Sequence, residues 1–145
     1  MKLYVESSLL VSALTTEAAS PHIQEWLQKQ EPDLLFISLW VETEVSSALS
    51  LKVRTGALTP AHREICLGGF AALKKRSFSI APIKPKHFVS AARLIDASQH
   101  GLRAADALHL AVSMDIGAAL CTLDAKFAQC AAALGAEVNF LSRAL

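Results

Sequence analysis

The chain has 145 residues, which suits one domain with a substantial core and is too short for two. Fourteen Lys and Arg against thirteen Asp and Glu leave a formal net charge of +1, so no overall field favours nucleic acid or an anionic membrane, and any nucleic-acid contact must be local. The mean hydropathy of +0.36 is high for a lone monomer, so we expect a partner to cover some apolar surface.

Neither a membrane segment nor a secretion signal is predicted. No run approaches the roughly 18 apolar residues that a membrane helix requires, and Glu6 interrupts the region where a signal peptide is apolar. The three cysteines are odd in number and lack paired metal-ligand spacing, which indicates neither a disulfide framework nor a zinc site. We therefore expect a cytoplasmic protein.

Short apolar runs alternate along the chain with stretches of helical periodicity. Strands are predicted at 3–5, 34–37, 78–80 and 118–122, with a weaker one at 138–141. Helices are predicted to open at Ser20–Pro21 with Ser20 as the N-cap, after a cap at Ser38, at Thr59–Pro60, across 89–95 and across 104–114. This alternation predicts one α/β domain over 1–145, a three-layer α/β/α sandwich around a parallel sheet of four or five strands.

Two acids follow predicted strands. Glu6 ends the first strand and Asp124 follows the fourth. In an open parallel sheet, ligands gather outside the carboxyl ends of the strands, so these two carboxylates are expected at one edge. Each acid could instead cap the helix that comes next, and the sequence leaves both interpretations open.

Asp106 lies in the apolar helix 104–112, where a carboxylate needs a compensating partner. It could act as an N-cap or first-turn acid, pair with Arg103 or His109, or share a metal ion with other carboxylates. His109 itself is expected to be a buried histidine bonded to backbone or to an acid, rather than a catalytic residue.

The helix after Ser38 offers Glu42 and Glu44, which fall about 80° to either side of its apolar stripe. Periodicity does not choose between them. Acids from four places, without a Cys or His ligand set, fit a hard cation such as Mg²⁺ or Mn²⁺. The chemistry that such a site supports is phosphodiester hydrolysis.

Four stretches carry a family resemblance, namely LYVESSLLV (3–11), TEVSSAL (43–49), LRAADALHLA (102–111) and CTLDAKF (121–127). With these segments in this order, the sequence resembles the PIN-domain family, in particular the VapC-like ribonuclease toxins of prokaryotic toxin–antitoxin pairs. The resemblance implies a compact α/β/α sandwich and cleavage of RNA that depends on Mg²⁺ or Mn²⁺. It also implies a homodimer and an antitoxin that covers the active site.

The four acids of the family align with Glu6, Glu44, Asp106 and Asp124, which the resemblance therefore implies are catalytic. The alignment selects Glu44 over Glu42. By the same resemblance, Glu6, Asp106 and Asp124 are the expected metal ligands.

Three further residues match positions that line the family's site. Ser8 and Thr122 match hydroxyl positions, and Arg103 matches a basic or polar position that could contact phosphate, with simple solvent exposure at a helix start as the alternative. The departure is Glu6, because the family nearly always has Asp there. One extra methylene moves the carboxylate by about 1.5 Å, which matters for an ion that demands near-ideal octahedral geometry.

Two hypotheses follow. The first is a Mg²⁺-dependent endoribonuclease toxin. The second is a PIN-like RNA- or protein-binding module in which Glu6 has weakened or abolished catalysis. A phosphatase with an aspartyl nucleophile is disfavoured, because the first strand ends in Glu and no second acid follows two positions on.

Overall fold

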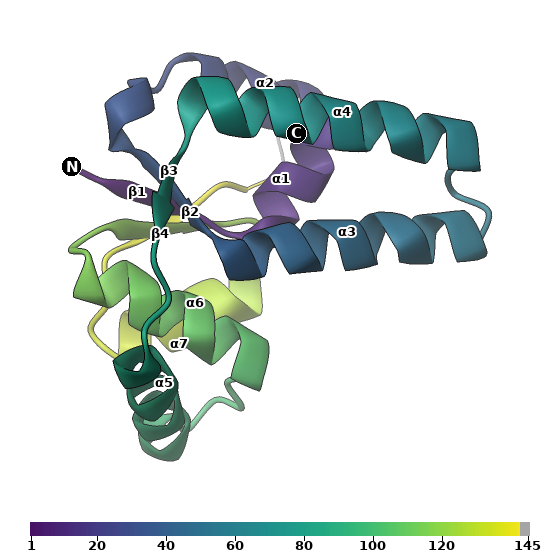
Figure 1. Ribbon diagram of the computed structural model, residues 1–145. Coiled ribbons are helices and arrows are strands. Elements are labelled where there is room, and N and C mark those ends of the chain that lie inside the picture. Colours follow the sequence, from purple (N-terminus) through teal and green to yellow (C-terminus); the bar gives the residue numbers. More distant parts are fainter. Residues whose placement is uncertain (143–145) are drawn as a thin grey trace.

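A single parallel sheet organises the protein, for which a computed structural model describes residues 1–142 (Figure 1). Within these residues five strands pair in the order β3-β2-β1-β4-β5, and every pairing is parallel. The strands are β1 Leu3–Val5, β2 Leu35–Ser38, β3 Ser79–Ala81, β4 Ala119–Thr122 and β5 Val138–Phe140. All five predicted strands are confirmed, each end lying within one residue of its prediction.

Helices cover both faces of this sheet. They are α1 Ser7–Leu14, α2 Ser20–Gln28, the short 3-10 helix η1 Pro32–Leu34, α3 Leu39–Arg54, α4 Pro60–Ser77, α5 Pro85–Ala97, α6 Ala104–Asp115 and α7 Ala125–Ala133. In Figure 1, α1, α2 and α4 lie above the sheet and α5, α6 and α7 lie below it, while α3 and α4 run antiparallel and extend beyond the sheet. The predicted three-layer α/β/α sandwich is confirmed.

Local sequence signals explain most helix ends. The Thr59 hydroxyl accepts from the backbone N–H of His62 at 3.1 Å and Pro60 follows it, so α4 begins as predicted. Gly56, with a φ of 81°, ends α3 in the left-handed region that glycine adopts without strain. The helix predicted at 89–95 begins earlier, at Pro85, because this proline also serves as a first helical residue.

Two predicted caps differ from the structure. The prediction for Ser20 is wrong, since Ala19 is the N-cap of α2 and Ser20 is already helical. The Ser20 hydroxyl instead stabilises the preceding turn. It accepts from the N–H of Glu17 at 2.8 Å and donates to the carbonyl of Thr15 at 2.7 Å. Ser38 does occupy the N-cap position of α3, but its side chain makes no capping bond.

The strand order reverses between β1 and β4. The chain lays β2 and then β3 on one side of β1, and afterwards returns to place β4 and β5 on the other side. Val5 pairs in register with Cys121, so the residues that follow these two strands emerge next to each other. Such a reversal leaves a crevice at the carboxyl ends of the strands, which is where ligands bind in open α/β sheets.

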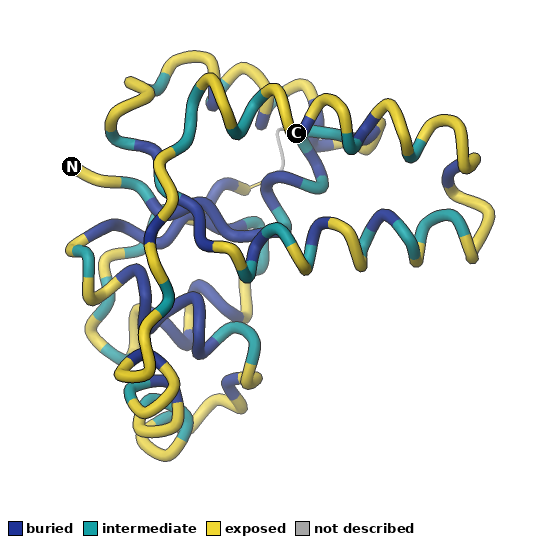
Figure 2. The backbone as a smooth tube through the Cα atoms, in the orientation of Figure 1, coloured by how far each residue is buried: buried dark blue, intermediate teal, exposed yellow. Residues whose placement is uncertain are grey.

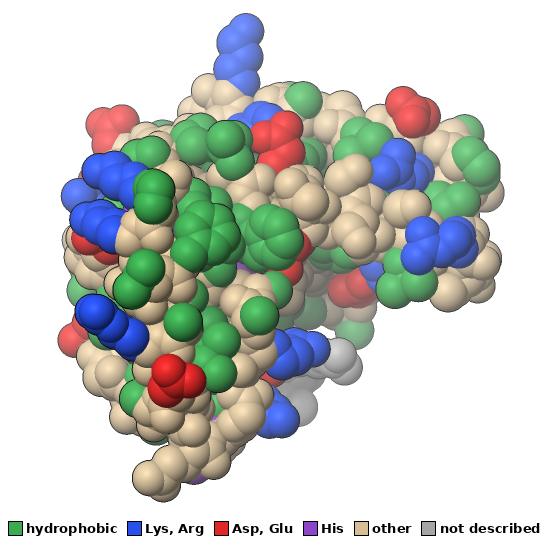
Figure 3. Space-filling model, turned by 60° about the horizontal axis from the view of Figure 1, so that its bottom comes forward, with side chains coloured by type: hydrophobic (Ala, Val, Ile, Leu, Met, Phe, Trp, Pro, Cys, Tyr) green, Lys and Arg blue, Asp and Glu red, His purple; other side chains and the backbone are tan. Residues whose placement is uncertain are grey.

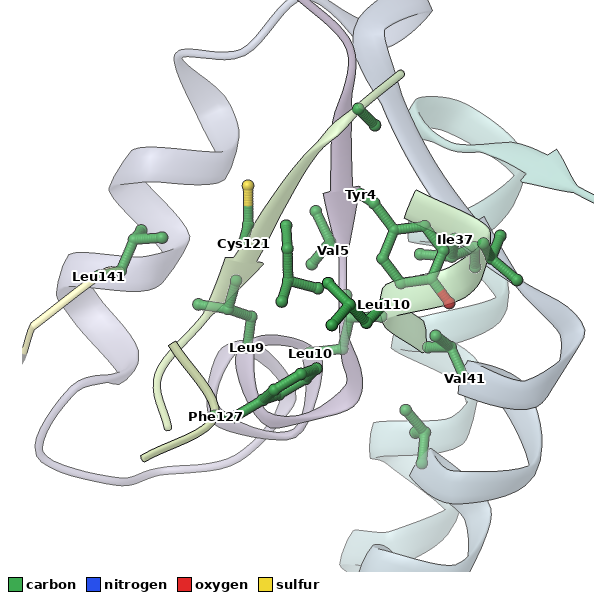
Figure 4. Close-up of a cluster of buried hydrophobic side chains, with 14 of the residues drawn as sticks. Tyr4, Val5, Leu9, Leu10, Ile37, Val41, Leu110, Cys121, Phe127 and Leu141 are labelled. Atoms are coloured by element: carbon green, nitrogen blue, oxygen red, sulfur yellow. The ribbon is translucent and has the colours of Figure 1, made fainter. Parts of the chain in front are cut away.

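The core lies between the sheet and the inner faces of the helices (Figure 2). Tyr4, Val5 and Cys121 from the central strands are fully buried, and they belong to one cluster with Leu9 of α1 and Leu110 of α6 (Figure 4). In the described part of the chain no helix combines the length and the apolarity needed to cross a membrane.

Candidate functional site

Glu6 sits at the end of β1 and caps α1. One of its carboxylate oxygens accepts from the backbone N–H of Ser8 at 3.1 Å, and the other accepts from the hydroxyls of Ser8 and of Thr122, the latter at 2.9 Å. Only 6% of the residue is exposed. Burial raises the pKa of the Glu6 carboxyl, because the bonds from Ser8 and Thr122 offset only part of the desolvation. The interpretation of Glu6 as a helix cap is confirmed.

Asp124 likewise caps the following helix. Its Oδ1 accepts from the N–H of Phe127 at 3.0 Å, at the start of α7. Its own N–H donates to the Thr122 hydroxyl at 3.0 Å, the same hydroxyl that donates to Glu6. Thr122 therefore joins the two acids across the β1/β4 reversal, and Ser8 makes a similar link by accepting from the N–H of Leu123 at 3.2 Å.

Asp106 lies in the first turn of α6, and both Asp106 and Asp124 pair with the guanidinium of Arg103. The guanidinium of Arg103, the N-cap residue of α6, donates from Nε to Asp106 Oδ2 at 3.3 Å and from Nη2 to Asp124 Oδ2 at 3.4 Å. Burial raises the pKa of the Asp106 carboxyl, and the nearby Arg103 counters this only in part. Of the alternatives for Asp106, the first-turn position and the pairing with Arg103 are confirmed, whereas His109 pairs elsewhere.

Glu44 reaches the same region from α3. Its Oε1 accepts from the Ser7 hydroxyl at 2.7 Å and from Nε2 of His109. Burial works to raise the pKa of the Glu44 carboxyl, but the bonds and charges of His109, Ser7 and Arg103 outweigh it and hold this pKa below its usual value. Glu42 instead pairs with Lys74 at 2.9 Å, so the structure brings Glu44 and not Glu42 to the other acids.

A cavity of about 300 Å³ opens beside the paired aspartates. It carries both signs of charge, since Arg103 and Lys126 line it together with Asp106 and Asp124. Cations at its wall could meet an anionic ligand, while the two carboxylates could hold a metal.

Of the three predicted metal ligands, Asp106 and Asp124 are arranged in a way that suits a divalent cation. Within residues 1–142 no group of three or more His, Cys, Asp or Glu side chains is arranged to hold a metal ion. Asp106 and Asp124 are two oxygen donors already turned toward one positive group, which suits Mg²⁺ or Mn²⁺. Glu6 is turned toward Ser8 and Thr122, so the three-acid ligand set remains a prediction.

Some residues at the site were not predicted to be there. Tyr4 and Ser38 join the network through His109, because the Tyr4 hydroxyl lies 2.7 Å from Nδ1 of His109 and 2.8 Å from the Ser38 hydroxyl. The available signal was a tyrosine inside a buried strand, since a buried phenol hydroxyl requires a partner. His109 is confirmed as a buried histidine bonded to an acid, and that acid is Glu44.

Comparison with known proteins agrees with this architecture. FitAcB from Neisseria gonorrhoeae has a TM-score of 0.71 at 14% identity, over 96% of each chain. VapC20 from Mycobacterium tuberculosis, a sarcin-ricin loop cleaving toxin, has a TM-score of 0.69 at 15% identity, over 93% of this chain and 96% of that one. VapBC2 from Rickettsia felis, bound to a promoter DNA fragment, has a TM-score of 0.66 at 16% identity, over 97% and 98%.

At these identities the solved structures bear on the fold alone. No curated protein sequence matches the chain. The family model described as PIN domain matches residues 3–133, which is most of the chain. The protein therefore belongs to the PIN domain family.

Proposed function

We propose that the protein is a metal-dependent endoribonuclease and the toxin of a toxin–antitoxin pair. The observation that carries the proposal is the joining of four acids from separate elements at the β1/β4 reversal. Thr122 links Glu6 to Asp124, Arg103 links Asp124 to Asp106, and Ser7, next to Glu6, binds Glu44. Such a set of carboxylates, in a PIN domain, suits hydrolysis of a phosphodiester.

Each side chain has a defined part in this reaction. Asp106 and Asp124 would hold Mg²⁺ or Mn²⁺, with Glu6 as a third candidate ligand. The bound ion supplies neutralisation of phosphate charge and makes water more acidic. Because its pKa is lowered, Glu44 remains ionised at neutral pH and accepts a hydrogen bond from the attacking water. Arg103 meets the phosphate once it leaves the two aspartates.

The substrate and the protein partner are proposed from neighbouring structures together with the site. VapC20 is a sarcin-ricin loop cleaving toxin, which supports structured RNA as the substrate. VapBC2 bound to promoter DNA and a toxin–antitoxin complex from Klebsiella pneumoniae support a cognate antitoxin that covers the acids. A cytoplasmic location is part of the same proposal.

A homodimer is part of the proposal, because a broad apolar face lies uncovered. A groove of about 690 Å³ runs between the start of α3 and helices α5 and α6. Leu39 and Phe88, both among its lining residues, are 59% and 60% exposed. Figure 3 shows apolar side chains gathered across the face that carries α5. A second copy of the chain would remove this surface from water.

One observation favours a second candidate function, a PIN-like RNA- or protein-binding module without catalysis. The oxygens of Glu6 are occupied by Ser8 and Thr122, and the raised pKa of this carboxyl disfavours the charge that a metal ligand needs. This alternative predicts binding of RNA or a partner with no Mg²⁺ binding in calorimetry. Activity that appears only in Glu6→Asp would favour it.

Cleavage of structured RNA tests the main proposal. The purified protein with Mg²⁺ should cut the RNA internally, and Asp106→Asn should lower the rate by about 100-fold or more. Asp96→Asn, which removes an exposed acid of α5, is the matched control and should leave the rate unchanged. Cleavage that survives Asp106→Asn, or that persists after chelation of divalent ions, would exclude the assignment.

A further inference from the structure

A line of buried polar groups crosses the core and ends on Glu44. The Ser38 hydroxyl contacts the Tyr4 hydroxyl at 2.8 Å, the Tyr4 hydroxyl contacts Nδ1 of His109 at 2.7 Å, and Nε2 of His109 contacts Oε1 of Glu44. Tyr4, Ser38 and His109 are at most 1% exposed. In Figure 4 the ring of Tyr4 extends from β1 toward α3, with its hydroxyl on the side of the labelled Val41.

Burying these polar groups costs folding free energy, and orienting the Glu44 carboxylate is a function that accounts for this cost. Polar groups removed from water require partners, and a phenylalanine or leucine would fill the same core without that requirement. Ser38 stands at the N-cap of α3 yet makes no capping bond there, because its hydroxyl is directed to Tyr4. The helix thus forgoes a stabilising contact in favour of the line to Glu44.

The hydrogen-bond directions follow from Glu44. Its pKa is lowered, so the ionised carboxylate only accepts, and Nε2 of His109 must carry the hydrogen. A ring with its one hydrogen on Nε2 accepts at Nδ1 from the Tyr4 hydroxyl, which accepts in turn from Ser38. The Glu44 carboxylate therefore selects the tautomer of His109, and the Tyr4 hydroxyl satisfies the other ring nitrogen.

The consequence for Glu44 is a fixed orientation. Both of its protein partners, Ser7 and His109, bind Oε1, and within the described residues no protein donor reaches Oε2. We propose that His109 is a positioning residue that aims the free oxygen of Glu44 at the reaction site, with the hydroxyls of Tyr4 and Ser38 holding its ring in place. The inference rests on the proposed nuclease function, which assigns Glu44 its part in the reaction.

Two substitutions of His109 separate positioning from packing. The amide of glutamine can take the place of Nε2 and still donate to Glu44, whereas the amide of asparagine can take the place of Nδ1 and pair only with Tyr4. We expect His109→Asn to lower kcat by about 10- to 100-fold with KM nearly unchanged, and His109→Gln to retain most of kcat. Each variant leaves one buried partner unpaired, so both should lose thermal stability to a similar extent. Equal losses of kcat would overturn the proposal.

A spectroscopic readout does not depend on activity. The ring ¹⁵N shifts of His109 should report the hydrogen on Nε2 in the unaltered protein, and the Nδ1 shift should change in Tyr4→Phe because its hydroxyl partner is lost. Glu44→Gln should move the Nε2 proton resonance upfield, because the carboxylate acceptor is lost. A hydrogen on Nδ1, or a resonance unmoved by Glu44→Gln, would overturn the positioning role. An unaltered protein that fails to cleave RNA would instead refute the proposed function while leaving these shifts to decide the inference.

Discussion

Asp106 and Asp124 share one guanidinium, although they stand at the starts of different helices. Arg103 donates to Asp106 at 3.3 Å and to Asp124 at 3.4 Å. The charge of Asp124 also contributes to the raised pKa of Asp106, so the two carboxylates repel each other and a cation between them is favourable. The side chain of Arg103 is 75% exposed and can swing away, which makes it a resident cation that a metal ion would displace.

Removal of Arg103 should therefore strengthen metal binding. Exposed ion pairs are worth about 0.2–1 kcal/mol each, so the loss of two of them in Arg103→Gln should lower the Kd for Mn²⁺ by about two- to thirtyfold in calorimetry. Arg93→Gln makes the same change of charge at an exposed position of α5 and should leave the Kd unaltered. Weaker binding in Arg103→Gln would show that Arg103 does not compete with the metal.

The Thr122 hydroxyl should contribute measurably to the free energy of unfolding. It is fully buried, donates to Glu6 at 2.9 Å and accepts from the N–H of Asp124 at 3.0 Å. Thr122→Val keeps the shape but leaves that N–H unpaired, so the free energy of unfolding should fall by about 1–3 kcal/mol in urea titrations. Thr16→Val removes an exposed hydroxyl and should change the free energy of unfolding by less than about 0.5 kcal/mol. A Thr122→Val protein as stable as its parent would contradict the link.

The sequence was sufficient to predict the strands because each one coincides with a short apolar run that polar or turn residues bound. All five matched within one residue, including the weaker one at 138–141. The prediction of Ser20 as an N-cap was wrong, and hydrophobic periodicity could not have shown why. The hydroxyl of Ser20 is bonded to Glu17 and Thr15, and this depends on the geometry of the turn before the helix.

The candidate site was predicted less completely. Strand ends located Glu6 and Asp124 at one edge, yet whether Glu6 caps a helix or faces a metal depends on where the hydroxyls of Ser8 and Thr122 lie. The contact of Tyr4 with His109 joins residues 105 positions apart, which no local pattern reveals. Residues that pair through the tertiary fold were therefore the ones that sequence alone left open.

Stability at low pH should depend on Asp115 at the end of α6. Hydrogen bonds from Lys86 and His87 lower the pKa of this carboxyl to about 2, whereas the unfolded chain has the ordinary value near 3.9. The folded protein thus resists protonation, so the stability from Asp115 is present above about pH 4 and is lost as the pH falls toward 2. Asp115→Asn should be less stable than the parent at neutral pH, with a shallower decline below pH 4 in urea titrations. Asp96→Asn should follow the parent, and a parallel decline in Asp115→Asn would contradict the assignment.

The apolar groove yields a last prediction, on assembly. Phe88 is 60% exposed in the groove, whereas Ile65 on α4 is 71% exposed and lies outside it. If a second copy covers the groove, Phe88→Glu would bury a charge without a partner and should shift the protein from dimer to monomer in sedimentation equilibrium. Ile65→Glu makes the same chemical change on a surface that the dimer leaves in water, and should preserve the dimer. A parent protein that sediments as a monomer, or a Phe88→Glu variant that remains dimeric, would remove this face from the interface.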